Sequence, residues 1–374
     1  MNNFDEYIIQ GEPDQKEKSI IWQTAIGLQQ TDGLKPSLYL IETAKQNIEG
    51  DITFEEVKNR LDTYYKTQAS KGIDTGDRTE EADKVSARIA EILSEKTFSF
   101  SPLAYLNIHR RLFIGIYKFA GKIRDYNITK TEWVLDGETV LYAGAENLRA
   151  TLEYDIEREK NFDYKGLDIQ QTIEHIAQFT ANLWQVHVFG EGNTRTTVVF
   201  LIKYLQRLGF QDINNDMFAT HSWYFRNALV RANYKNIAKG VYATNLYVVR
   251  FLENLLLGEN HILKNREMHI HFKANEGINV ENDPVSLKNE RIKDKKFPVI
   301  GKKFLANGEK FPVIGLEIIK LMENNPAVTI IELSTQLNVS DRAVKNNINK
   351  LRDAGIITRI GSDKKGSWKI IIEK

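Results

Sequence analysis

The sequence predicts a mainly α-helical protein: an all-α core with one small β-hairpin, and a smaller unit at the C-terminus. From Glu80 to Leu257, apolar residues recur every three or four positions, the spacing of long amphipathic helices. Within that run, Tyr126–Leu141 alternates apolar and polar residues around Asp136-Gly137, a dipeptide that favours a two-residue hairpin turn. Residues 258–310 are rich in Gly, Asn, Asp, Glu and Lys, which indicates a connector to the last unit.

The composition is that of a globular protein with a sizeable core, at 42% hydrophobic and 10% aromatic residues. The 51 basic and 50 acidic residues nearly cancel, so overall charge does not draw the chain to nucleic acid or membrane. There is no cysteine, which excludes disulfides, zinc thiolates and cysteine catalysis. The polar Met1–Glu17 does not resemble a signal peptide, and no apolar run reaches the roughly 18 residues of a membrane span. We expect a cytoplasmic protein.

Residues 1–82 form the first division, a polar helical segment. A helix begins near Pro36-Ser37, and Gly50 ends it before a second helix. Thr53 is the expected N-cap of that second helix, and residues 70–82 have the composition of a loop.

The second division, residues 83–257, contains the long helices of the core. Two apolar helix faces are formed by Val85, Ile89, Ile92 and Leu93, and by Leu103, Leu106 and Leu112. Residues 258–310 follow as the linker.

Residues 311–374 form the last division, in which three helices precede two short strands. The expected elements are Leu316–Asn324, Thr329–Asn338, Asp341–Leu351, Ile356–Ile360 and Trp368–Ile372. A turn at Val339-Ser340 joins the second and third helices. This order is similar to a winged helix-turn-helix domain of the bacterial regulator kind.

The run His187–Arg195, of sequence His-Val-Phe-Gly-Glu-Gly-Asn-Thr-Arg, combines a base, an acid, two glycines, an amide and a guanidinium. It separates two apolar-periodic segments, which predicts a helix, a tight loop and a helix. Backbone N–H groups at the start of a helix bind phosphate, a histidine can take a proton from a hydroxyl, and a carboxylate can hold Mg²⁺. The run therefore predicts a site for phosphoryl or nucleotidyl transfer.

The same run resembles the motif of the Fic family, His-x-Phe-x-Asp/Glu-Gly-Asn-Gly/Lys-Arg-x-x-Arg. The upstream stretch Ile108–Arg124 is also similar to that family's core, and the resemblance extends over roughly residues 85–255. Two positions depart from the motif. Thr194 stands where Gly or Lys is usual, and Val198 stands where the second Arg is expected.

The resemblance implies a protein adenylyltransferase, which moves AMP from ATP to a Ser, Thr or Tyr hydroxyl of a target protein or of itself. His187 would be the general base, and Glu191 would hold Mg²⁺. The implied nucleotide-binding residues are Phe189, Gly190, Gly192, Asn193, Thr194, Arg195, Leu141, Tyr142 and Asn233.

Each of these residues also has a plain structural interpretation. His187 could end a helix, Glu191 could be a first-turn acid favoured by the helix dipole, and Asn233 could cap a helix. Arg195 could be a solvated helix arginine. The hairpin Val134–Tyr142 resembles the family's flap, which pairs with the backbone of the target, or it is an ordinary surface hairpin.

Val198 leaves the mechanism open, because the missing Arg normally grips the γ-phosphate. Either Arg149, Arg231 or Lys235 substitutes for it, or the γ-phosphate is held loosely, or the donor differs. Two other functions therefore stay open. One is a DNA-binding regulator whose core binds nucleotide but catalyses weakly, and the other is a transferase that uses another nucleotide or phosphodiester donor.

The stretch Ala44–Gly50 resembles the inhibitory helix of Fic proteins and their antitoxin partners, with the motif Ser/Thr-x-x-x-Glu-Gly/Asn. Glu49 and Gly50 fit the motif, but Lys45 does not. In the family this Glu pairs with the second motif Arg, which is Val198 here. The hypothesis is that Glu49 still inhibits by charge repulsion or through Arg195. The alternative is a plain amphipathic helix that ends at Gly50.

The C-terminal unit has ten Lys or Arg and seven Asp or Glu over residues 311–374, a net charge of +3. The wing adds Lys364 and Lys365, and the expected recognition helix offers Arg342, Lys345, Asn346 and Asn349. DNA binding is one interpretation, and docking to protein or dimerisation is the other. Expected partners are thus a target protein with an acceptor hydroxyl, DNA and a second copy of the chain, but no membrane.

Overall fold

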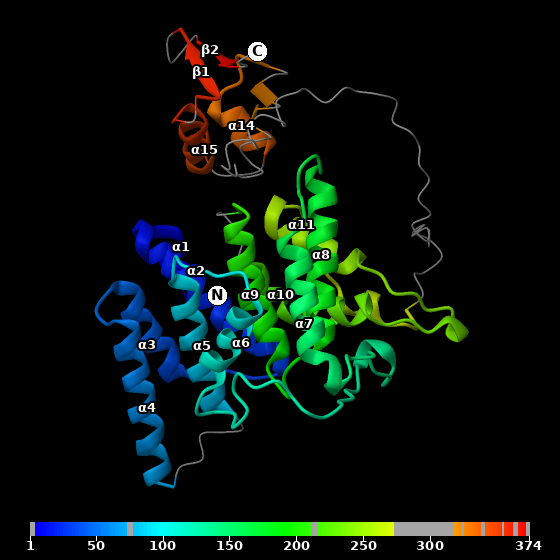
Figure 1. The fold of residues 1–374 in the computed structure, drawn as a ribbon. Coiled ribbons are helices and arrows are strands. Elements are labelled where there is room, and N and C mark those ends of the chain that lie inside the picture. The colour runs from blue at the N-terminus through cyan, green and yellow to red at the C-terminus, as the bar shows by residue number, and fades with distance from the viewer. Residues whose placement is uncertain are drawn as a thin grey trace.

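The protein is described by a computed structural model. It covers residues 4–72, 78–210, 216–272, 318–319, 321–322, 325–337, 341–353, 355–361 and 366–371. These residues are mainly helical, with a single two-stranded antiparallel sheet among them, which confirms the predicted fold class (Figure 1). None of the helices in these ranges is both long and apolar enough to cross a membrane.

The helices that begin at Ser37 and Thr53 are found as predicted, whereas the expected loop at residues 70–82 is shorter, because the next helix already begins at Thr79. The bounds of the N-terminal helices are α1 Asp5–Gln10, α2 Pro13–Gly27, the 3-10 helix η1 Leu28–Asp32, α3 Leu38–Glu49 and α4 Phe54–Ser70. Ser37 and Thr53 are N-caps whose hydroxyls accept backbone N–H groups, and Thr53 forms a capping box with Glu56. Gly50 ends α3 in the left-handed conformation, with φ of 86°.

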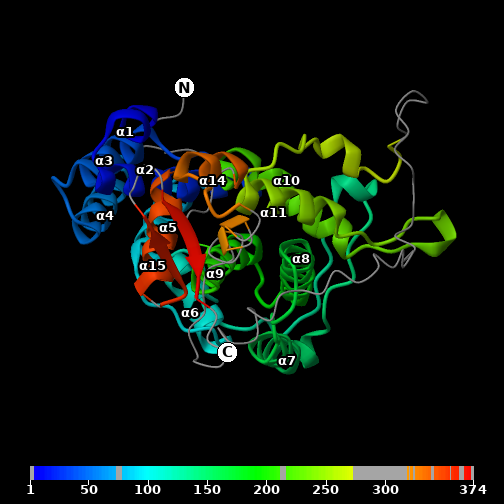
Figure 2. The ribbon, with the colours of Figure 1, turned by 90° about the horizontal axis from the view of Figure 1, so that it is seen from above.

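The core helices follow the N-terminal helices in the chain and pack against them. They are α5 Thr79–Ser94, α6 Pro102–Phe113, α7 Leu148–Lys160, α8 Ile169–Val186, α9 Asn193–Arg207, α10 Asp216–Ala232 and α11 Leu246–Leu257. Figures 1 and 2 show α1 to α5 together on one side and α7, α8 and α11 on the other, with α6 and α9 between them. Short 3-10 helices lie at η2 Trp133–Leu135, η3 Ala145–Asn147, η4 Ile237–Lys239 and η5 Asn265–Met268.

The N-terminal helices share one apolar core with the rest, because buried side chains form a single cluster from Phe4 to Met268. Trp22 of α2 is fully buried in this core, and its indole N–H donates to Asn47 of α3 over 3.0 Å. At Gly27, α2 approaches α10 so closely that a Cβ there would lie 2.2 Å from the Cα of Ala219. Residues 1–82 therefore pack as part of the helical body.

The expected β-hairpin at Tyr126–Leu141 is present as a chain reversal without a β ladder among the described residues. The Glu132 N–H donates to the Glu138 carbonyl over 3.0 Å, but the residues between them form η2. Val134 and Leu135 are both fully buried. Successive residues of a strand point to opposite faces, so burial of both in one core favours a helical turn instead.

The C-terminal unit has its own apolar cluster and the predicted order of elements. It contains α14 Ile330–Gln336, α15 Asp341–Asp353 and the antiparallel strands β1 Ile357–Ile360 and β2 Ser367–Ile370. Residues 318–319 and 321–322 are helical, as expected, while the rest of Leu316–Asn324 and the wing residues Lys364 and Lys365 lie outside the described residues.

Replacement of Trp22 by Ala should lower the free energy of unfolding of the helical body by about 3–5 kcal/mol, because it opens a cavity where a fully buried indole lies. Urea denaturation followed by circular dichroism measures this. Ile9→Ala is the control: that side chain is 77% exposed, and its loss should cost less than about 0.5 kcal/mol. If Trp22→Ala removes only a small early transition and leaves the main one in place, the N-terminal helices fold separately.

Candidate active site

His187 ends α8 in a conformation that few residues other than glycine adopt. Its φ is 49°, and such a left-handed residue costs roughly 1–3 kcal/mol unless its surroundings hold it. Here the backbone is held on both sides. The His187 N–H donates to the Trp184 carbonyl over 3.1 Å, and Arg124 Nε donates to the His187 carbonyl over 2.8 Å. A fixed, strained histidine at the start of a loop is a candidate functional residue.

The His187 imidazole is buried and has one nitrogen to spare. Nδ1 lies 3.3 Å from the Trp184 carbonyl, which only an N–H group can satisfy, so Nδ1 is the donor. Nε2 is buried and has no hydrogen-bond partner among the described residues. Burial, and after it the charges of Lys130, Arg226 and Arg124, lower the pKa of His187 well below 6.5. The ring is therefore neutral, with a lone pair on Nε2 that can accept a proton.

Phe189 fixes the loop from below, as expected of a buried aromatic. It is fully buried, with the His109 ring 3.6 Å from it in parallel and the Tyr105 ring 5.7 Å away. His109 Nε2 donates to the Glu191 carbonyl over 3.0 Å, and its Nδ1 accepts the Gly121 N–H over 2.8 Å. Burial lowers the pKa of His109 to about 4, so the ring stays neutral and keeps both bonds.

The loop closes on itself through Asn193. Its Oδ1 accepts the Phe189 N–H over 2.9 Å, and its Nδ2 donates to the Phe189 carbonyl over 2.8 Å. Gly192 precedes α9 with φ of 78°, and a Cβ there would lie 2.4 Å from the ring of Phe113. A Cβ at Gly190 would lie 2.5 Å from the Tyr126 hydroxyl. Contact with the buried Phe113 thus requires glycine at 192, whereas at Gly190 the exposed Tyr126 side chain can move aside, and the first turn of α9 directs its N–H groups toward this loop.

Glu191 is half-buried and ionised. Burial acts to raise its pKa, but the charge of Lys130 and the Gly192 N–H hold the pKa below 4.5. Oε1 accepts the Gly192 N–H over 3.1 Å, and Oε2 lies 3.3 Å from Lys130 Nζ. No group of three or more His, Cys, Asp or Glu residues that could hold a metal occurs in the described ranges. An ionised carboxylate such as Glu191 could be one ligand of a hard cation.

The Thr194 hydroxyl packs against α8. Trp184 Nε1 donates to the Thr194 hydroxyl over 3.0 Å, in the buried space between α8 and α9. The hydroxyl thus satisfies a buried indole N–H that would otherwise be unpaired, and the nucleotide contact expected of Thr194 stays a prediction.

Arg195 is the largest departure from the expected site. Its side chain is fully buried, with Nε 2.7 Å from Asp32 and Nη2 2.7 Å from Glu81. Nη1 donates to Gln29 over 3.0 Å, and the guanidinium lies on the Phe113 ring. The expected solvated or phosphate-binding arginine instead joins α9 to η1 and α5. A buried guanidinium needs such carboxylate partners, and these occupy the donors that a phosphate would use.

Val198 is fully buried in α9, so the position of the missing second Arg faces the core. Among the described residues, no hydrogen bond or ion pair joins Arg149, Arg231 or Lys235 to the loop, and Arg149 pairs with Glu153 at 3.8 Å. Lys130, which no motif in the sequence marks, does reach the loop. No local pattern marks it, because it belongs to the segment expected as a hairpin strand.

The segment before α7 covers His187. The Tyr142 ring packs 4.2 Å from the imidazole and is nearly buried, whereas Leu141 is 83% exposed. The Tyr142 hydroxyl donates to Glu132 over 3.3 Å, and Glu132 pairs with Arg226 through contacts of 2.7 and 3.0 Å. Tyr142 thus lies against His187, while the exposed Leu141 contacts the end of α8 only through its carbonyl, which accepts from Gln185 Nε2 over 2.9 Å.

Asn233 and Glu49 have partners outside the loop. Asn233 Nδ2 donates to the carbonyls of Ala181 and Leu229 over 2.9 and 3.0 Å, in line with the helix-capping interpretation. Glu49 is exposed at the end of α3 and accepts a hydrogen bond from Tyr7. Its expected contact with Arg195 is not formed in the described part of the chain, because Asp32 and Glu81 pair with that guanidinium instead.

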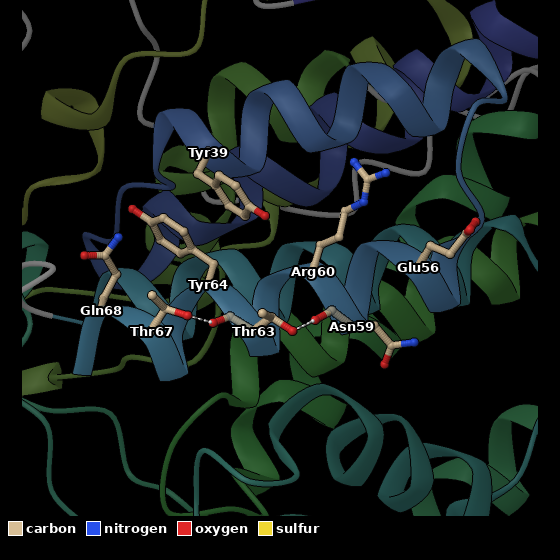
Figure 3. Close-up of a pocket in the computed structure, with 8 residues that line it drawn as sticks. All are labelled: Tyr39, Glu56, Asn59, Arg60, Thr63, Tyr64, Thr67 and Gln68. Carbon is tan, nitrogen blue, oxygen red and sulfur yellow. Dashed lines mark hydrogen bonds between the residues drawn. The ribbon is translucent and has the colours of Figure 1, made fainter. Parts of the chain in front are cut away.

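A shallow hollow of about 400 Å³ lies between α3 and α4, away from these residues (Figure 3). The Tyr39 and Tyr64 rings stack there with centroids 4.0 Å apart, and none of the loop residues lines the hollow.

The four polar residues expected on the recognition helix share one face of α15. Arg342, Lys345, Asn346 and Asn349 are all exposed. The opposite face packs into the C-terminal core through Val344, Ile348 and Leu351.

Two family models match parts of this chain. Residues 99–205 match the Fic/DOC family, and residues 314–358 match a winged helix-turn-helix DNA-binding family. No curated protein matches the chain. The crystal structure of a Fic family protein from Desulfovibrio desulfuricans G20 aligns with 100% of this chain and 93% of that one, at 11% identity and a TM-score of 0.40. On the two family matches, the chain contains a Fic/DOC domain, which carries the His187–Arg195 loop, and a C-terminal winged helix-turn-helix domain.

Proposed function

We propose that this protein transfers AMP from ATP to a hydroxyl group of a protein, with His187 as the general base. The observation that carries the proposal is the buried, neutral imidazole whose Nε2 has no hydrogen-bond partner among the described residues. It lies in the loop that also holds an ionised Glu191 and leads into the first turn of α9. A base, a cation ligand and a phosphate-binding helix end are the parts that nucleotidyl transfer requires.

The reaction follows from these positions. His187 Nε2 takes the proton of a Ser, Thr or Tyr hydroxyl as its oxygen attacks the α-phosphorus of ATP. A new P–O bond forms, the bond from the α-phosphorus to its bridging oxygen breaks, and pyrophosphate leaves. Glu191 would hold Mg²⁺, which when bound supplies charge neutralisation at the phosphates. The N–H groups at the start of α9 hold phosphate oxygens. Because Nε2 is buried, the acceptor reaches it only after side chains packed on the imidazole, such as Tyr142, move.

The wild-type protein, incubated with α-labelled ATP and Mg²⁺, should carry label that His187→Ala lacks, because the variant has no base. Label counted on protein after separation from nucleotide measures this. His261→Ala is the matched control, since that histidine pairs with Glu253 outside the loop.

Label from γ-labelled ATP on wild type would contradict AMP transfer and indicate phosphoryl transfer. If wild type is silent, Glu49→Gly tests the inhibitory hypothesis for that residue. Unlabelled GTP, CTP or UTP that competes better than ATP would favour another donor. ATP binding without any label in either protein would favour a nucleotide-binding regulator.

The pH dependence should reflect the lowered pKa of His187. A base must be unprotonated, and a pKa well below 6.5 keeps it so as the pH falls. We expect kcat/KM, which reports on groups of the free enzyme, to stay level from about pH 8 through pH 6.5. Initial rates of labelling across this range measure it. A half-maximal rate at about pH 6.5 would contradict the buried, neutral state of the histidine.

We infer that the C-terminal domain binds DNA through α15. The observation that favours this is the single exposed face that carries Arg342, Lys345, Asn346 and Asn349, in a domain that matches a DNA-binding family. Lys and Arg on such a face would contact phosphates, and Asn would contact base edges.

Lys345→Ala in the full chain should weaken DNA binding and reduce the slope of log K against log salt by about 1, because one phosphate contact is lost. Fluorescence anisotropy with labelled duplex DNA at several salt concentrations measures both quantities. Lys58→Ala, an exposed lysine of α4, is the control. If the full chain does not bind duplex DNA even at low salt, the domain serves as a docking module for protein.

A further inference from the structure

The donor site lacks the cations that the motif would provide. Val198 is apolar and buried, and Arg195 is saturated by Asp32, Gln29 and Glu81. A nucleoside triphosphate carries several negative charges, and helix N–H groups alone neutralise only a fraction of a charge. Another side chain must therefore contact the β- and γ-phosphates.

Three cations act on the His187 ring: Lys130, Arg226 and Arg124. Two of these cations, Arg124 and Arg226, already have protein partners. Arg124 donates to the carbonyls of His187, Tyr126 and Ala143 and so holds the loop backbone. Arg226 is bound by both oxygens of Glu132, which is itself buried. Removing either from its partners would leave a buried group unpaired.

Lys130 differs from both. Its only ion-pair partner among the described residues is Glu191, at 3.3 Å, which is long for a charge-assisted hydrogen bond. Its side chain is 28% exposed, and an ammonium group has three donors. Its backbone is fixed, because the Lys130 N–H donates to the Thr139 hydroxyl over 3.2 Å across the chain reversal. A flexible, partly exposed cation thus lies beside the carboxylate on which the donor's phosphates would meet the metal.

We propose that Lys130 binds the β- and γ-phosphates of the nucleotide donor, in place of the arginine that Val198 replaces. Without nucleotide, Lys130 neutralises Glu191. Glu191 would also be the carboxylate that holds a divalent cation, and such a cation would take the partner of Lys130 and leave its three donors for phosphate oxygens. This inference rests on the proposed nucleotide site and names the residue that distinguishes a triphosphate from a monophosphate there.

The test is nucleotide binding to the full chain in a His187→Ala background, where turnover does not interfere. Isothermal titration with ATP and with AMP, each in Mg²⁺, gives two dissociation constants for every variant. Lys130→Gln should weaken ATP binding about 10- to 100-fold, the loss expected for a hydrogen bond to a charged group, and AMP binding by less than about threefold. Lys130→Arg should restore most of the ATP affinity, because it keeps the charge.

Lys122→Gln, an exposed lysine on the segment before Lys130, is the matched control and should change neither constant. Equal losses of ATP and AMP affinity in Lys130→Gln, or no loss, would overturn the role of Lys130 while leaving the proposed function intact. Absence of ATP binding to the parent protein would overturn both. Thermal unfolding of each variant, followed by circular dichroism, checks the fold. If Lys130→Gln is unfolded, Lys130→Arg alone decides the outcome. Loss of the preference for ATP over AMP in Lys130→Arg would then refute the proposal.

Discussion

The burial of Arg195 is the constraint on which the rest of the helical body depends. A guanidinium cannot lie in a core without carboxylates, since the cost of removing an unpaired charge from water is several kcal/mol. Asp32 and Glu81 meet that requirement, and they come from η1 and α5, far from α9 in sequence. The ion pairs therefore determine how α9 lies against the N-terminal helices. Residues 1–82, which the sequence marks as a division of their own, share one apolar core with the Fic domain.

With α9 held from that side, the loop before it is held from the other. His109 is the central element, because it stacks on Phe189 and donates to the Glu191 carbonyl while accepting the Gly121 N–H. Its lowered pKa keeps both bonds, since a protonated ring could not accept from Gly121. Asn193 completes the closure. Such a loop is preorganised, which is the property by which charged and polar groups contribute most to transfer reactions. The strained φ of His187 is tolerated because these contacts hold its neighbours.

The sequence predicts those features of the fold that depend only on neighbouring residues. The caps at Ser37 and Thr53, the left-handed Gly50 and the exposed face of α15 follow from residue type and helical spacing, and each is found. Pairings between distant segments have no such signal. Glu81 and Arg195 are 114 positions apart, so nothing near either residue marks them as partners. Lys130 and Glu191 are 61 positions apart, so the sequence does not mark their contact either. At Val134 and Leu135 the alternating pattern favoured strands, but burial of both residues outweighed it.

The cost of removing charges from water also distinguishes Arg195 from Lys130. A phosphate that approached Arg195 would have to displace Asp32 and Glu81, and each carboxylate would then be left without its partner inside the protein. A phosphate that approaches Lys130 displaces one half-exposed carboxylate, which water or a divalent cation can satisfy at once. The difference in desolvation therefore decides which cation is structural and which is able to bind a ligand. A chain with Val at position 198 can keep a cation for the donor only at such a partly solvated position.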